Sequence, residues 1–246
     1  MTPRQRLDIS LVARGLVQSR EKAQALILAG QVTVDGQKAQ KAGQPVSPEA
    51  QISVAEPLRY VSRGGLKLEA ALREFAVSVR DKVCLDVGTS TGGFADCLLQ
   101  QGARTVHCVD TGAGQIDWKL RTNPNVRLHE RTNARYLKPE DIGEQVQLIA
   151  CDVSFISVTL LVPALAPLLQ PAGDWIILVK PQFEVGKAQV GKGGIVRDPA
   201  LHALACNRVK SVVEELGFST RIIDSPILGT EGNREFLLHA RRLNAA

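Results

Sequence analysis

From Val83 onward, short apolar runs alternate with longer helical stretches, and this alternation constrains the fold more than any other feature of the 246-residue sequence. Such a pattern is typical of a parallel sheet covered by helices. The expected strands are residues 83–87, 105–109, 126–129, 146–151, 175–179, 220–223 and 236–240, and the expected helices are 94–101, 157–169 and 199–216. Seven strands that end in a hairpin-like pair predict an α/β fold with a Rossmann-like, doubly wound sheet.

The segment before this sheet has a different pattern and predicts a small α+β domain. Residues 6–17 have helical spacing of apolar positions, and Ser19 is placed as the N-cap of a second helix that runs to Gly30. Asp35-Gly36 between two short β-favouring runs indicates a hairpin. Pro57 and the pair Gly64-Gly65 then favour a hinge. We therefore expect domains at 1–58 and 66–246, joined by a linker at 59–65, with a helix at 66–75 opening the second domain.

The composition is that of a soluble protein. A hydrophobic content of 44% is enough for a sizeable core, and no apolar run reaches the roughly 18–20 residues that span a bilayer. The N-terminus lacks the apolar centre of a signal peptide, so we expect a cytoplasmic protein with no membrane contact. The five cysteines have no Cys-x-x-Cys spacing, and neither disulfides nor a metal site are expected. No obligate protein partner is evident.

Polar residues follow the predicted parallel strands, at the edge where ligands bind in doubly wound sheets. They are Asp86 and Gly88 at the end of the first strand, Asp110 at the end of the second, Glu130 of the third, Asp152 of the fourth and Lys180 of the fifth. Asp86, Asp110 and Asp152, three acids at three of these strand ends, favour a ligand site over a structural accident.

The turn from Asp86 to Gly93 indicates which ligand is bound. Its sequence, Asp-Val-Gly-Thr-Ser-Thr-Gly-Gly, is not the Gly-x-Gly-x-x-Gly of dinucleotide enzymes, and an acid before the turn suits the amino group of S-adenosylmethionine. Asp110 lies where a carboxylate would accept the two ribose hydroxyls. The expected cofactor-binding residues are Asp86, Gly88, Ser90, Gly92, Asp110 and Glu130. A nicotinamide dehydrogenase is the alternative class of enzyme. A glycine-rich turn taken alone is equally compatible with a tight turn that binds no ligand.

Several longer motifs together resemble the TlyA family. They are Ser19-Arg20-Glu21-Lys22-Ala23, Asp35-Gly36, Ser62-Arg63-Gly64-Gly65-Leu66-Lys67-Leu68, Asp86 to Phe94, and Glu130-Arg131-Thr132-Asn133. The likeness runs nearly end to end, with one small departure at Thr89, where a smaller residue is expected. This family, also called hemolysin A, consists of ribosomal RNA cytidine 2′-O-methyltransferases with an S4-type RNA-binding domain and an FtsJ-like catalytic domain.

The resemblance implies S-adenosylmethionine-dependent methylation of 23S ribosomal RNA, with 16S ribosomal RNA as a second candidate substrate. It also implies a catalytic set made of Lys67, Asp152, Lys180 and Glu235. Lys180 would activate the ribose hydroxyl, by holding it in line with the methyl group or by acting as base. Lys67 would add positive charge, and the two acids would orient the ammonium groups. A non-catalytic ribosome-assembly factor and a membrane-active hemolysin are the alternatives.

The charge distribution indicates where RNA binds. Residues 1–60 hold eight Lys or Arg against five acids, and the aromatic content of 4% argues against a base-stacking platform. The expected RNA contacts are Arg4, Arg6, Arg20, Lys41 and Arg63, with Arg14, Lys22 and Lys38 treated as ordinary surface charges. The glycine-rich segment 182–195 is expected to be a mobile loop that closes over the substrate.

Overall fold

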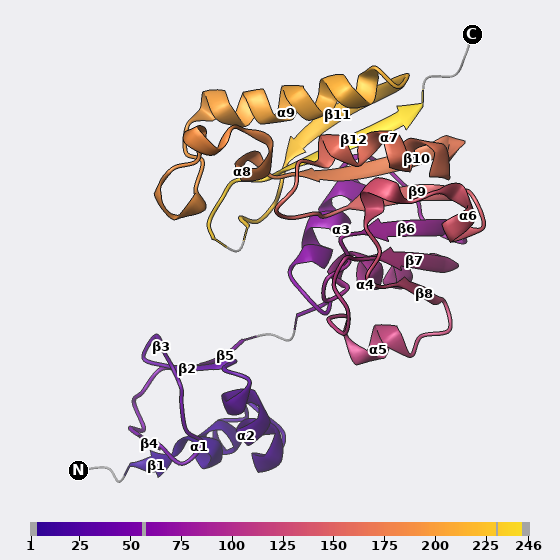
Figure 1. The fold of residues 1–246 in the computed structure, drawn as a ribbon. Coiled ribbons are helices and arrows are strands. Elements are labelled where there is room, and N and C mark those ends of the chain that lie inside the picture. Colours follow the sequence, from indigo (N-terminus) through magenta and orange to yellow (C-terminus); the bar gives the residue numbers. More distant parts are fainter. Residues whose placement is uncertain (1–3, 56–57, 230, 243–246) are drawn as a thin grey trace. The chain divides into compact units, whose positions relative to one another are not determined.

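The computed structural model describes residues 4–55, 58–229 and 231–242, and the chain separates into two compact units between Leu58 and Arg59 (Figure 1). The first unit contains helices α1 (Leu7–Ala13) and α2 (Arg20–Leu28). Its strands are β1 (Gln5–Arg6), β2 (Val32–Val34), β3 (Gln37–Lys38), β4 (Pro45–Val46) and β5 (Ile52–Val54). Strands β1 and β4 pair antiparallel, and β3-β2-β5 form a second antiparallel sheet.

The turns of the first unit follow from local sequence. Ser19 caps α2 by accepting a hydrogen bond from the backbone N–H of Lys22, as predicted. Asp35 and Gly36 both have positive φ (50° and 77°), which confirms the predicted hairpin between β2 and β3. The predicted first helix ends earlier than residue 17, at Ala13, because Gly15 adopts a left-handed conformation (φ 68°) two residues later.

The second unit alternates strands and helices along most of its length. Its helices are α3 (Gly64–Glu74), α4 (Gly93–Gln100), α5 (Trp118–Arg121), α6 (Pro139–Ile142), α7 (Val162–Leu165), α8 (Pro181–Glu184) and α9 (Pro199–Glu214). Its strands are β6 (Val83–Val87), β7 (Thr105–Val109), β8 (Val126–His129), β9 (Val146–Cys151), β10 (Leu169–Val179), β11 (Phe218–Asp224) and β12 (Phe236–Arg242). Short 3-10 turns at 134–136, 158–160, 166–168, 187–189 and 192–194 complete the unit.

The seven strands form one sheet in the order β11-β12-β10-β9-β6-β7-β8. Neighbours from β10 through β8 are parallel, and β12 runs antiparallel to both β10 and β11. The order reverses between β6 and β9, so their carboxyl ends open a crevice of the kind that binds ligands in doubly wound sheets. The predicted fold class is confirmed, including the closing antiparallel pair.

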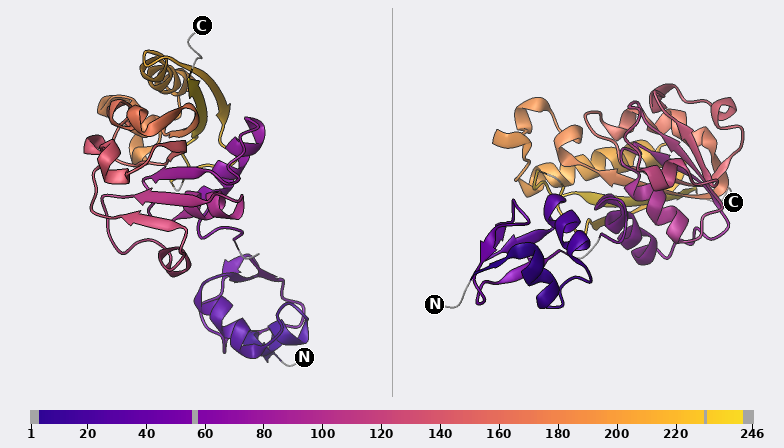
Figure 2. Two further views of the ribbon diagram at one scale, coloured as in Figure 1. Left: turned by 90° about the vertical axis from the view of Figure 1, so that its right-hand side faces the viewer. Right: turned by 90° about the horizontal axis from the view of Figure 1, so that it is seen from below.

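Helices cover both faces of the sheet, as Figures 1 and 2 show. Alternate residues of the strands enter two separate hydrophobic cores: Ile176 packs with the cluster that includes α3 and α4, and Ile177 packs with the cluster that includes α7 and α9. The central strands are apolar at nearly every position, because a parallel sheet is buried on both faces. All five cysteines are buried, consistent with their predicted use as small core residues.

Three predicted segments differ in the structure. Residues 59–65 belong to the second unit rather than to a linker: Tyr60 is buried, and a Cβ on Gly65 would lie 2.3 Å from its ring, so the glycine pair permits close packing at the start of α3. The predicted helix 157–169 is broken into short pieces, because Pro163 and Pro167 lack the N–H groups that a continuous helix needs. The predicted loop 182–195 contains most of α8 and two 3-10 turns.

Candidate active site at the carboxyl ends of the central strands

The turn after β6 brings the backbone close to the neighbouring strand end. Gly88 has φ 82°, and a Cβ there would lie 2.4 Å from the carbonyl oxygen of Asp152, so this position requires glycine. Ser90 also has positive φ, and its backbone N–H donates to Asp110 Oδ2 at 2.8 Å. The other carboxylate oxygen of Asp110 accepts from the N–H of Gly112 at 2.7 Å. These bonds fix the carboxylate at the end of β7.

A cavity of about 570 Å³ lies against this turn and is called the larger cavity below. Asp110 is one of its walls, and Gly88, Ser90 and Asp152 also line it. Apolar side chains, including Val109 and Ile156, form much of the remaining wall. Its size and mixed lining are those of a cavity for a cofactor-sized ligand.

Three of the predicted cofactor residues do not line the larger cavity. Asp86 is fully buried beneath the turn, where its Oδ2 accepts from the N–H of Ala95 at 3.1 Å. Gly92 (φ 96°) allows close packing on α5, since a Cβ there would lie 2.3 Å from Leu120. Glu130 forms an ion pair with Arg121 at 2.5 Å and lines a small neighbouring recess beside Asp110. A position near a strand end did not by itself predict which of these residues line the larger cavity.

Burial gives Asp86 an unusual ionisation. Removal of the carboxyl from water raises its pKa to about 8, and the nearby negative charge of Asp152 adds to the increase. Glu130 shows the opposite behaviour, because its hydrogen bond to Arg121 lowers the pKa of the carboxyl. The pKa values of Asp86 and Glu130 are therefore shifted in opposite directions.

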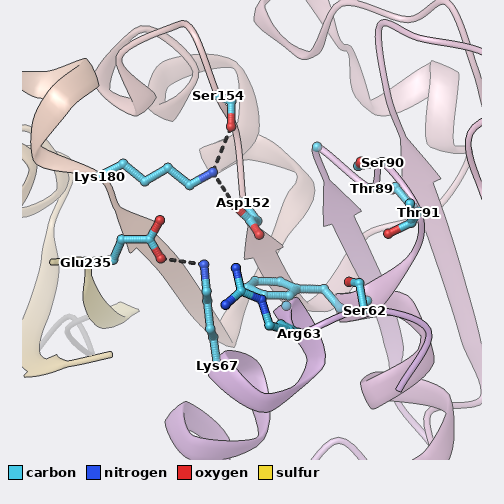
Figure 3. Close-up of a pocket in the computed structure, with 14 residues that line it drawn as sticks. Ser62, Arg63, Lys67, Thr89, Ser90, Thr91, Asp152, Ser154, Lys180 and Glu235 are labelled. Carbon is cyan, nitrogen blue, oxygen red and sulfur yellow. Dashed lines mark hydrogen bonds and ion pairs between the residues drawn. The ribbon is translucent and has the colours of Figure 1, made fainter. Parts of the chain in front are cut away.

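A second cavity, of about 280 Å³, is called the lysine cavity below. Lys67, Asp152, Lys180 and Glu235 all line it, although they come from α3, from the ends of β9 and β10, and from the start of β12 (Figure 3). It shares Gly88, Ser90, Asp152 and Ser154 with the larger cavity. A group bound in one cavity therefore lies directly beside a group bound in the other.

The four charged residues form two ion pairs. Lys67 Nζ donates to Glu235 Oε2, and both side chains are buried. Lys180 Nζ lies 2.6 Å from Asp152 Oδ1 and donates to Ser154 Oγ at 2.8 Å. Each lysine therefore has its own carboxylate partner. Figure 3 shows both ammonium groups pointing toward the same space.

The structure adds residues that sequence reasoning did not select. Ser154 lines both cavities and contacts Lys180. Phe155 is 93% exposed, has φ 67°, and packs against Phe183 with ring centroids 5.4 Å apart. Both phenylalanines line a third cavity together with Lys180. The signal in the sequence was their position, within three residues of a strand-end Asp or Lys.

The predicted RNA contacts fall into two groups. Arg4, Arg6, Arg20 and Lys41 lie in the first unit, where Arg6 and Arg20 are half exposed and both bind the buried carboxylate of Asp8. Arg63 lies in the second unit and lines the lysine cavity (Figure 3).

Arg14, expected to be an ordinary surface charge, has a structural role instead. It donates hydrogen bonds to the carbonyl oxygens of Ser47, Pro48 and Ala50, and so ties α1 to the segment before β5.

Comparison with known proteins agrees with this architecture. Residues 60–242 match the FtsJ-like methyltransferase family and residues 5–52 match the S4 domain. The fold and these two matches thus define an FtsJ-like methyltransferase that carries an S4 domain, and the dehydrogenase alternative is excluded. The sequence is 49% identical to YqxC of Bacillus subtilis, over 96% of this chain and 85% of the relative.

Two further similar proteins identify the family within this class. The 16S/23S rRNA (cytidine-2′-O)-methyltransferase TlyA of Mycobacterium tuberculosis is 46% identical over 98% of this chain and 91% of its own. A solved hemolysin structure from Streptococcus thermophilus is 42% identical, with a TM-score of 0.76, and covers 100% of this chain and 90% of its own. The chain belongs to the TlyA family.

The hemolysin name of some relatives raises the question of membrane contact. In residues 4–55, 58–229 and 231–242, no helix is long and apolar enough to cross a bilayer.

Proposed function

We propose that the protein transfers a methyl group from S-adenosylmethionine to the ribose 2′-hydroxyl of a cytidine in ribosomal RNA. The observation that carries this proposal is the lysine cavity, in which Lys67 and Lys180 are each paired with a carboxylate beside a cofactor-sized cavity. A ribose hydroxyl is a weak nucleophile, and positioned ammonium or amine groups are what its activation needs.

The residues that line the larger cavity can hold S-adenosylmethionine. Asp110 presents two oxygens that each keep a lone pair beyond the backbone N–H groups they already accept, so it can receive both ribose hydroxyls. Gly88 and Ser90 bring backbone to the boundary with the lysine cavity, where the sulfonium would face the substrate. When bound, the cofactor supplies a methyl group already activated by the positive sulfur. In this arrangement Asp86 supports the turn from beneath, and Glu130 orders the adjoining segment through Gly114.

The chain's own residues then position the nucleophile. Lys180, held by Asp152 and Ser154, directs its remaining N–H or lone pair toward the 2′-oxygen. Lys67, fixed by Glu235, places a second positive charge on the same cavity.

S-adenosylmethionine, held by Asp110 and by the turn at Gly88 and Ser90, would supply the methyl group to the 2′-oxygen and would leave with the electron pair of its carbon–sulfur bond. The hydroxyl proton would pass to Lys180 in its neutral form, or to water where Lys180 only positions the hydroxyl. The barrier is lowered chiefly by alignment of the oxygen with the methyl group.

The S4 domain is proposed to hold the RNA. Arg4, Arg6, Arg20 and Lys41 present positive charge on the first unit, and Arg63 presents it at the lysine cavity. Phosphate contacts of this kind position an RNA without reading its sequence. The M. tuberculosis relative is named for both 16S and 23S rRNA, and we propose 23S rRNA first and 16S rRNA as a second substrate.

The decisive experiment measures transfer of label from methyl-tritiated S-adenosylmethionine to purified 50S and 30S subunits that lack the modification. Wild-type protein is expected to label RNA, and Lys180→Ala is expected to lose transfer while keeping its thermal unfolding midpoint. Mapping 2′-O-methyl groups in the product RNA then identifies the nucleotide. Undiminished transfer by Lys180→Ala would contradict the mechanism.

The same assay separates the alternatives. A non-catalytic assembly factor would bind the subunits and transfer no label. A hemolysin would release dye from liposomes incubated with pure protein, and no release is expected.

A further inference from the structure

Ser154 lies at the meeting point of three cavities. It lines the larger cavity, the lysine cavity and the third cavity beside Phe155 and Phe183. Its Oγ lies 2.8 Å from Lys180 Nζ and accepts a hydrogen bond from it, a contact visible at the top of Figure 3. The side chain is exposed, so its hydroxyl has no packing role that would explain its orientation.

The segment that carries Ser154 is fixed at both ends. The N–H of Asp152 donates to the carbonyl oxygen of Val87 at 2.9 Å, and the N–H of Val158 donates to Glu184 Oε1 at 2.8 Å. Glu184 is buried and also accepts from Ser157 Oγ. Since Glu184 belongs to α8, directly after Lys180, this contact ties the loop after β9 to the loop after β10. The hydroxyl of Ser154 is therefore held in place relative to Lys180 before any substrate arrives.

The ammonium of Lys180 has one hydrogen-bond acceptor, Ser154, and one ion-pair partner, Asp152. Asp152 Oδ1 lies 2.6 Å from the nitrogen and Ser154 Oγ lies 2.8 Å from it. With Asp152 alone, the ammonium could rotate about its bond to Cε and the nitrogen could swing around the carboxylate. The directional hydrogen bond to Ser154 Oγ restricts that freedom, and it limits the directions left for the remaining N–H groups or for the lone pair of the neutral amine.

We propose that Ser154 is a positioning residue that fixes the direction in which Lys180 addresses the target hydroxyl. Asp152 supplies the charge partner, and Ser154 supplies the orientation. A hydroxyl suits this position better than a second carboxylate, because it can accept a hydrogen bond from the ammonium and donate one to the neutral amine. It therefore supports Lys180 both as a hydrogen-bond donor to the 2′-oxygen and as its base.

This inference rests on the proposed function for its kinetic test. Ser154→Ala is expected to lower kcat about tenfold or more, the scale on which loss of alignment slows a positioned reaction. We expect the KM for ribosomal subunits and the Kd for S-adenosylmethionine to stay within about twofold of wild type. The unfolding midpoint should shift by no more than about 1–2 °C, roughly the range of a surface substitution. Ser154→Thr keeps the hydroxyl and is expected to restore most of kcat. Ser219→Ala, which removes an exposed hydroxyl bonded to the carbonyl of Arg241, is the control and should match wild type.

A second measurement does not depend on activity. In protein labelled with ¹³C-lysine, the Cε resonance of Lys180 is assigned by its loss in Lys180→Met, and its order parameter is measured in wild type, Ser154→Ala and Ser154→Thr. The inference requires a rigid Cε in wild type and the Thr variant and a mobile one in the Ala variant. An equally rigid Cε in Ser154→Ala overturns it, as does an unchanged kcat. If wild-type protein transfers no methyl group at all, the proposed function fails, and the order parameters still decide the role of Ser154.

Discussion

Lys67 and Glu235 are 168 residues apart in the chain and form a buried ion pair in the lysine cavity. The pair links α3, the first helix of the second unit, to the residue that precedes β12, the last strand along the chain. Gly229 makes room for it, because a Cβ there would lie 2.5 Å from Glu235 Oε1. The contact therefore serves two purposes, since it joins distant elements and fixes a positive charge beside Lys180.

The two purposes can be separated by substitution. Glu235→Leu leaves the Lys67 ammonium buried without a partner and is expected to lower the free energy of unfolding by about 3–5 kcal/mol. The double variant Lys67→Met/Glu235→Leu replaces the pair with apolar groups and is expected to recover most of that loss. Both variants should lack methyl transfer. Urea unfolding measures the stability, and a double variant as unstable as the single one would contradict this account.

Asp110 should control cofactor affinity without affecting RNA. Asp110→Asn keeps an acceptor for the turn but removes the charge that strengthens hydrogen bonds to ribose hydroxyls, a loss of about 1.5–3 kcal/mol. The Kd for S-adenosylmethionine, measured by titration calorimetry, is therefore expected to rise roughly 10- to 150-fold. Binding of ribosomal subunits should be unchanged. Glu140→Gln neutralises an exposed acid on α6 and should leave both affinities at the wild-type value.

The sequence predicted the fold closely because the strands of a buried parallel sheet are continuous apolar runs with turn residues between them. Strands β6 and β9 were predicted to the residue. Residues at strand ends were predicted as a group, since the topology brings them together. Their individual contacts were not, because these depend on side-chain packing. Asp86 lies within β6 and is buried, whereas Asp110 follows β7 and lines the larger cavity. Lys67 could be assigned only through the family resemblance, since nothing in a helical lysine distinguishes a buried one.

In the first unit, Asp8 organises two of the proposed RNA contacts. Its buried carboxylate accepts from Arg6 at 3.0 Å twice, from Arg20 at 2.8 Å and from Gln24 at 3.0 Å. The hydrogen bonds from Arg6 hold the pKa of this carboxyl well below its usual range. Both guanidinium groups keep N–H donors that Asp8 does not use, so they are held ready for phosphate.

Substitution of Asp8 gives a test in which charge and geometry predict opposite results. Asp8→Asn makes the unit more positive, which by charge alone would strengthen RNA binding. We expect the affinity to fall instead, by about tenfold, because neither arginine keeps its charged anchor. Glu49→Gln raises the charge of the same unit equally at a carboxylate that bonds to Ser47 and not to Arg6 or Arg20, and it should bind RNA at least as well as wild type. Filter binding at several salt concentrations measures both. If Asp8→Asn binds RNA more tightly than wild type does, the carboxylate only repels the RNA and does not hold the arginines in place for it.

The buried carboxyl of Asp86 should make stability depend on pH near neutrality. Its pKa is raised from 3.8 to about 8 in the folded protein, so the folded state binds more protons than the unfolded state between these values. Its contribution to stability is therefore greatest below pH 3.8 and declines as the pH rises toward 8. Asp86→Asn cannot ionise and keeps an acceptor for the N–H of Ala95. Relative to wild type, its free energy of unfolding should rise by about 1 kcal/mol for each pH unit between pH 6 and 8.

Urea unfolding at pH 6, 7 and 8 measures this difference, and the free energy of unfolding of Glu140→Gln should change with pH in parallel with that of wild type. If Asp86→Asn also runs parallel, the carboxyl is ionised throughout this range and its burial is compensated by the turn.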